Sequence, residues 1–159
     1  MPRRRPGAIR ATQTLGAHRL PEWTGEVPPI DRLSSHTSAA IRLAELSHSG
    51  DHIRPGRTAD LLRSYRKFLR QPERTLRLVA SVWPSCPGCR YDDIAVVRDT
   101  LQDVMRLLPL RARTELRRLL ATLDTEFRRR TLPDLDPQHW TDWDGTPFPW
   151  WHRRLYRDD

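Results

Sequence analysis

Two apolar stripes in the second half of the chain constrain its fold more than any other feature. The first covers residues 94–108 and the second covers residues 116–127, each in steps of three and four residues. Asp92 and Asp93 precede the first stripe, where carboxylates favour the N-terminus of a helix, and Pro109 follows it. Two such stripes joined by a short connector predict an antiparallel helical hairpin.

The front half of the chain carries two further helical patterns. Residues 31–48 show apolar side chains at helical spacing, with Ser34 among the residues that could cap the start. The segment "TADLLRSYRKFLRQP" is strongly amphipathic, with Thr58 as its expected N-cap and Pro72 as its stop. We therefore expect two helices ahead of the hairpin.

The segment at residues 73–83 fits a helix and a strand equally well. We favour a helix, because no nearby segment offers a convincing partner strand and a lone strand leaves its backbone groups unpaired. The expected fold class is all-α: a small irregular helical bundle that ends in the antiparallel hairpin.

Both ends of the chain differ in composition from its centre. Residues 1–30 are basic and rich in proline, so we expect an extended or disordered basic arm. Residues 31–132 form the expected helical domain. Residues 133–159 hold four of the six tryptophans together with several aspartates, and we expect this aromatic tail to pack back on the domain and enlarge a small core.

The net charge of +8 is distributed unevenly along the chain. Residues 1–90 carry 16 basic and 7 acidic side chains, whereas residues 91–159 carry 12 basic and 13 acidic ones. A cationic half attracts an anionic partner such as nucleic acid or an acidic protein surface. No stretch of 18 apolar residues is present and no apolar segment follows the basic start, so we expect a cytoplasmic protein that does not bind membranes.

Residues 53–90 hold the densest positive charge, with nine basic and two acidic side chains. This pattern predicts contacts to backbone phosphates with little reading of base sequence. The alternative is an ordinary solvated helix face. The predicted nucleic-acid-binding residues are Arg63, Arg66, Lys67, Arg70, Arg74 and Arg77.

The sequence "CPGC" contains both cysteines of the chain, Cys86 and Cys89. Two thiolates at this spacing can supply half of a zinc site, and His48 and His52 are the histidines most suited to complete it. The order of an apolar segment, this motif and a helix also resembles the active-site start of thioredoxin-like proteins, which implies a redox pair. The third interpretation is two thiols in a tight turn with no cofactor.

No complete catalytic motif occurs in the chain, so we expect a non-catalytic protein. The first functional hypothesis is a small basic protein that associates with nucleic acid through phosphates. The second is an adaptor that binds another protein through the Trp-rich tail or the leucine hairpin. A zinc or thiol-redox protein using Cys86 and Cys89 is the third.

Overall fold

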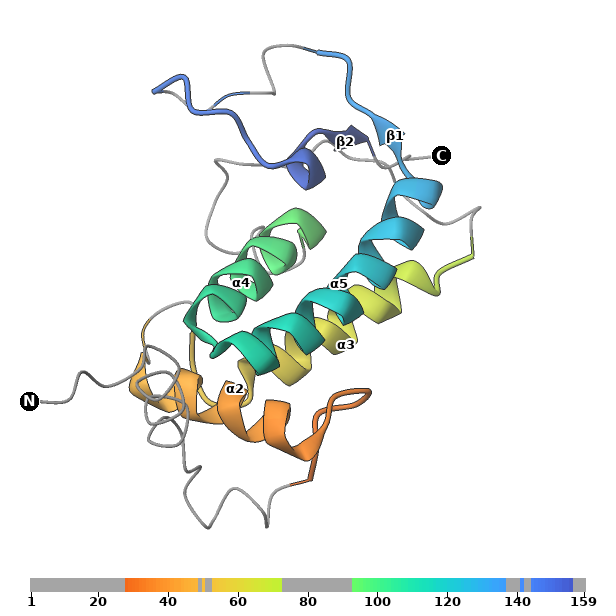
Figure 1. Cartoon of the computed structure of the whole chain (residues 1–159). Helices are drawn as coiled ribbons and strands as arrows, with labels where there is room; N and C mark the ends of the chain where they lie inside the picture. Colours follow the sequence, from red (N-terminus) through yellow and green to blue (C-terminus); the bar gives the residue numbers. More distant parts are fainter. Residues whose placement is uncertain are drawn as a thin grey trace, which may run out of the picture.

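The computed structural model describes residues 28–48, 50, 53–72, 93–136, 141 and 144–155. This part of the chain is mostly helical, which confirms the expected class (Figure 1). The ambiguous segment at 73–83 lies outside the described residues. The elements are α2 (Ser35–Ser47), α3 (Arg57–Leu69), α4 (Ile94–Leu107), α5 (Leu110–Arg130), the two-residue strands β1 (Leu132–Pro133) and β2 (Arg154–Leu155), and the 3₁₀ turn η5 (Trp150–His152).

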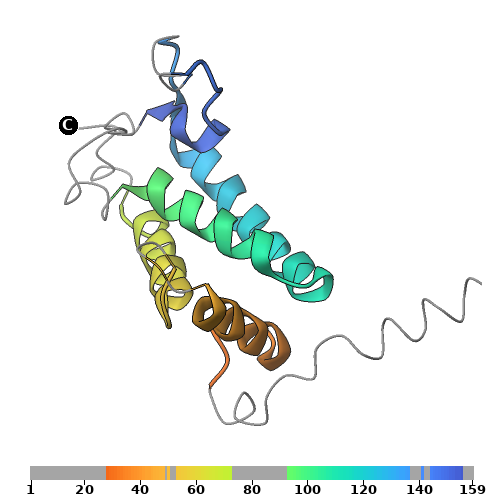
Figure 2. The same cartoon turned by 90° about the vertical axis from the view of Figure 1, so that its left-hand side faces the viewer.

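The apolar faces of the four helices meet in one core. α3 packs on α4 and α5, while α2 packs on α5 and α4. α2 lies at one end of the body and η5 at the other (Figures 1 and 2). The largest fully buried apolar side chains are Tyr65, Phe127, Ile41, Leu62, Leu101, Leu108, Leu116 and Leu120.

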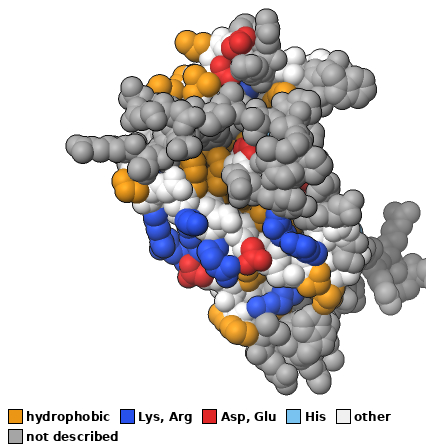
Figure 3. All heavy atoms as spheres, turned by 180° about the vertical axis from the view of Figure 1, so that it is seen from behind, with side chains coloured by type: hydrophobic (Ala, Val, Ile, Leu, Met, Phe, Trp, Pro, Cys, Tyr) orange, Lys and Arg blue, Asp and Glu red, His pale blue; other side chains and the backbone are white. Residues whose placement is uncertain are grey.

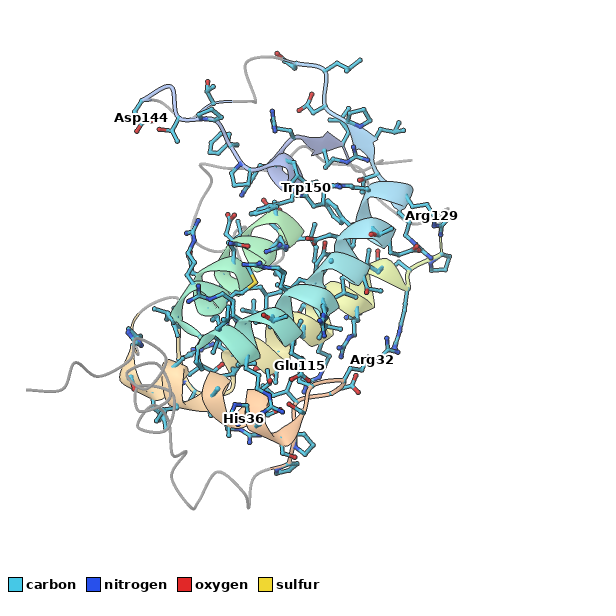
Figure 4. The ribbon with its side chains drawn as sticks, in the orientation of Figure 1. Arg32, His36, Glu115, Arg129, Asp144 and Trp150 are labelled. Atoms are coloured by element: carbon cyan, nitrogen blue, oxygen red, sulfur yellow. The ribbon has the colours of Figure 1, made fainter. Side chains whose placement is uncertain are left out.

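The start of α2 is held by its own cap and by a carboxylate from α5. The Ser34 side chain accepts a hydrogen bond from the Thr37 amide at 3.2 Å, as expected of an N-cap. Glu115 of α5 accepts from the Ser34 amide at 2.6 Å, from the Ser34 hydroxyl at 2.7 Å and from the Thr37 hydroxyl (Figure 4). Burial opposes ionisation of Glu115, but these hydrogen bonds hold the pKa of its carboxyl below the ordinary value.

The start of α3 uses a different device from the one predicted. Thr58 is not the N-cap: the helix begins at Arg57, and Gly56 occupies the cap position with φ of 82°. The side chain that caps α3 is Glu45 of α2, which is fully buried and accepts from the Gly56 amide at 2.8 Å and the Thr58 amide at 2.7 Å. Glycine has no Cβ, so Gly56 adopts this left-handed conformation without strain.

Two neighbouring residues of α4, Asp99 and Arg98, hold the described end of the chain. Asp99 accepts a hydrogen bond from the indole N–H of Trp151 at 2.7 Å, and its second oxygen lies 2.6 Å from Nε2 of His152. The guanidinium of Arg98 stacks over the Trp151 ring at 4.4 Å. β1 and β2 then pair antiparallel, with Leu132 opposite Leu155. Strands of two residues are too short for an alternating pattern, so sequence analysis did not predict them.

Candidate functional site

A groove of about 560 Å³ runs along one side of α3. Four of the six residues predicted to bind nucleic acid line it, and they come from successive turns of one helix. Figure 3 shows Lys and Arg side chains gathered on this face of the molecule, with acidic side chains among them. The lining residues are Ile30, Asp31, Ala59, Arg63, Arg66, Lys67, Arg70 and Gln71.

The opposite side of α3 is fixed in the core, so the groove side faces outward. Tyr65 is fully buried, and its hydroxyl donates to Asp124 of α5 at 2.9 Å. Asp124 also accepts from Arg98 of α4, with an Nε–Oδ1 distance of 2.9 Å. Burial raises the pKa of the Tyr65 phenol, and the Asp124 charge raises it further. This network ties α3 to both partner helices and sets the rotation of α3 about its axis.

Arg66 is the buried cation of the groove, with an exposed fraction of 8%. Its Nη1 donates to the Asp31 carboxylate at 2.5 Å, and its Nη2 donates to the Asp31 main-chain carbonyl at 3.1 Å. Burial lowers the pKa of the Arg66 guanidinium, the Asp31 carboxylate opposes this shift, and the charges of Arg32 and Arg70 add to it. Arg66 therefore differs from the other cations of α3: it is buried, because it follows Tyr65 at the border between the two faces of the helix.

The other three groove cations are exposed. Arg63 pairs with Asp60 one turn earlier in α3 at 2.7 Å, and the Arg63 side chain remains 75% exposed. Such a surface pair holds an arginine only weakly. Lys67 and Arg70 make no ion pair with any acidic side chain of the described residues. The exposed positive charge of the groove is thus concentrated on the last two turns of α3.

Several groove residues could not be found by sequence reasoning. Asp31 and Ile30 come from the turn before α2, between 32 and 40 positions before the cations of the groove. Ala59 gives the groove part of its apolar surface and carries no chemical signal of its own. Arg74 and Arg77 were predicted to extend the same site, but they lie outside the described residues.

Of the four residues predicted to bind a metal, the structure describes His48. His48 follows the last residue of α2, and its Nδ1 lies 3.1 Å from the Ala44 carbonyl oxygen. Cys86, Cys89 and His52 lie outside the described residues. Within the described ranges, no three His, Cys, Asp or Glu side chains come close enough together to hold a metal ion.

The surfaces expected for an adaptor are partly built into the core. Leu116, Leu120 and Leu123 of α5 are buried, as is Trp151 of the tail. Trp150 contacts Phe127, with 5.9 Å between the ring centroids (Figure 4). The guanidinium of Arg128 stacks on the Trp150 ring at 3.9 Å. These side chains therefore contribute to the body of the protein, while Leu110 and Leu135 are exposed.

In the described part of the chain, no helix combines the length and the apolar character needed to cross a bilayer. Comparison of the chain with protein-family models, with curated proteins and with solved structures finds no match in any of the three.

Proposed function

We propose that this protein is a non-catalytic nucleic-acid-associated protein whose α3 groove binds backbone phosphates. The observation that supports the proposal is the arrangement of Arg63, Lys67 and Arg70, three exposed cations that line a single hollow. Cations spread evenly over the surface would attract anions without positioning them. Cations that share one concave surface can contact neighbouring phosphates of one strand at the same time.

The length of the groove matches a short piece of a nucleic-acid backbone. Arg70 lies seven positions after Arg63, which corresponds to about 10 Å along the helix axis. One strand of duplex DNA presents a phosphate roughly every 3.4 Å along its axis. The described cations therefore cover about three nucleotide steps. Contacts of this kind orient a strand without reading its bases, so we expect little sequence preference.

The proposal includes the finer arrangement expected of the chain. In this arrangement the helices form an irregular bundle ending in the hairpin, and the N-terminal residues form an extended or disordered basic arm. The Trp-rich tail packs on the bundle. The adaptor hypothesis is less well supported, because Leu116, Leu120, Leu123 and Trp151 are buried in the body and Trp150 packs on Phe127. Phosphate binding requires no side chain that the core already uses, apart from Arg66.

The experiment is fluorescence anisotropy with a short labelled oligothymidylate and with a labelled duplex at low salt. The groove variant is Lys67→Gln/Arg70→Gln, and the matched control is Arg117→Gln/Arg118→Gln. Both remove two exposed cations, but Arg117 and Arg118 lie on α5 and do not line the groove. We expect the groove variant to weaken binding about tenfold or more and the control to weaken it less than about threefold. Equal weakening by both variants would contradict a defined site.

A further inference from the structure

One cation of the groove is held by an acidic residue of the groove itself. Arginine has five N–H donors in a planar fork that suits carboxylates and phosphates alike. In Arg66 two of these donors bind Asp31, one through the carboxylate and one through the main-chain carbonyl. The Nε donor is buried and has no hydrogen-bond partner among the described residues. Asp31 therefore occupies the place where a phosphate would bind Arg66.

The backbone of Asp31 is fixed although its side chain is exposed. Ile30 before it and Leu33 two positions after it are both buried, and the Leu33 amide donates to the Ile30 carbonyl at 2.9 Å. The Ile30 amide donates to the Ser38 hydroxyl at 2.8 Å, which ties the turn to α2. Between them, Arg32 adopts a left-handed φ of 64°, a conformation that costs a non-glycine residue energy.

The two contacts to Arg66 differ in how easily they can be replaced. The Asp31 side chain is 72% exposed, so its carboxylate can rotate into water and remain hydrated. The Asp31 carbonyl belongs to the anchored turn and stays in place. A phosphate can therefore replace the carboxylate at Nη1 while the carbonyl still positions the guanidinium through Nη2.

We infer that the Asp31 carboxylate is a built-in competitor that sets the affinity and selectivity of the groove for phosphates. This inference rests on the proposed function and deepens it. While Asp31 holds Arg66, the groove offers Arg63, Lys67 and Arg70 to a ligand. A single anion gains too little from one contact to displace the carboxylate. A strand with several linked phosphates gains Arg66 as an additional contact, because its other phosphates are already bound and raise the local concentration. Asp31 thus selects strands that carry several linked phosphates over single anions.

The test compares Asp31→Asn with Asp103→Asn. Asparagine keeps the size of the side chain and removes its charge, and the main-chain contact to Arg66 is retained. Asp103 is a matched control, because it also pairs with an arginine, Arg106 at 2.9 Å, and lies on α4 away from the groove. Each variant raises the net charge by one. Binding of labelled oligothymidylate is measured over a range of salt concentrations, with inorganic phosphate as a competing single anion.

We expect Asp31→Asn to bind the oligonucleotide about threefold to tenfold more tightly than the wild type. Its plot of log K against log salt should keep the slope of the wild type, because the strand contacts Arg66 in both proteins. Inorganic phosphate should compete better with Asp31→Asn than with the wild type. Asp103→Asn should change the affinity by less than about twofold, because distant surface charges are screened.

Failure of the competitor role can be distinguished from failure of the groove proposal. If the wild type binds and Asp31→Asn binds no more tightly, the competitor role is overturned and the groove proposal stands. If Asp31→Asn and Asp103→Asn tighten binding equally, the effect is one of net charge, and the competitor role is again overturned. If neither the wild type nor Asp31→Asn binds at low salt, the groove proposal is overturned together with this inference. Circular dichroism of each variant verifies that the helices are retained.

Discussion

Glu45 shows how strongly one buried side chain controls the placement of the groove. Its two carboxylate oxygens accept from the Gly56 and Thr58 amides at the start of α3. We predict that Glu45→Ala lowers the free energy of unfolding by about 2–4 kcal/mol, because both amides lose their partner and the Thr58 amide does so in a buried site. Glu45→Gln keeps one acceptor and should cost about half as much. The measurement is urea unfolding followed by circular dichroism.

The control for this prediction is an exposed carboxylate. Asp103→Ala removes a surface pair with Arg106 and should change the free energy of unfolding by less than about 0.5 kcal/mol. An effect of Glu45→Ala as small as that of Asp103→Ala would show that α3 does not depend on its cap.

Glu126 makes stability depend on pH in the acid range. Hydrogen bonds from Arg129 and then Arg130 lower the pKa of this carboxyl to about 2, whereas an unfolded glutamate titrates near roughly 4.3. A lowered pKa stabilises the fold at pH values above the pKa of the unfolded glutamate. This contribution disappears as the pH falls towards 2. Wild type should therefore lose stability relative to Glu126→Gln between about pH 5 and pH 2. The loss should stay below about 1 kcal/mol, because solvent screens the partly exposed pairs.

The check is a set of urea-unfolding curves of both proteins across this pH range. A difference between wild type and Glu126→Gln that stays constant with pH would contradict the assignment of the lowered pKa to Glu126.

At the scale of elements, α5 packs on all three of the other described helices. Leu120 of α5 lies in the core and is 1% exposed, whereas Leu110 on the same helix is 78% exposed. We predict that Leu120→Ala lowers the free energy of unfolding by about 2–5 kcal/mol through lost burial and the cavity that remains. Leu110→Ala removes the same atoms from the surface and should stay within about 0.5 kcal/mol of wild type. Thermal or urea unfolding compares the two variants, and similar values would place Leu120 outside the core.

The helices were predictable because helix burial repeats every three to four residues. Leu61, Leu62, Tyr65 and Leu69 alternate with the cations of α3, and this local pattern is visible without knowing the partner helices. The caps were predictable only where they are local. Ser34 caps its own helix, whereas α3 is capped by Glu45 from another helix.

In the candidate site, too, the features that depend on local sequence could be predicted, and those that depend on contacts between distant segments could not. Its cations lie on one amphipathic helix, so their shared face could be derived from spacing. The acidic residue that neutralises Arg66 comes from 35 positions away, and only the packing of α3 against the turn before α2 brings the two together. Burial of Arg66 has the same origin. Spacing therefore predicted which cations lie along the groove, but it could not predict that Arg66 is buried and paired with Asp31.

At the scale of the whole molecule, the body keeps its polar network inside and its cationic helix face outside. Arg98, Asp124 and Tyr65 connect three helices in the interior, while Arg63, Lys67 and Arg70 remain exposed along the groove. The central claim is that the exposed cations bind phosphates as a unit. Release of counterions makes such binding depend on salt in proportion to the number of phosphates contacted.

The most direct test is the salt dependence of oligonucleotide binding by wild type and by Lys67→Gln/Arg70→Gln. Wild type should give a linear fall of log K with log salt. The double variant should give a line that is shallower by about 1.4 for a single strand and about 1.8 for a duplex, the values for two lost phosphate contacts. Parallel lines for the two proteins would show that Lys67 and Arg70 contact no phosphate and would contradict the α3 groove as the binding site.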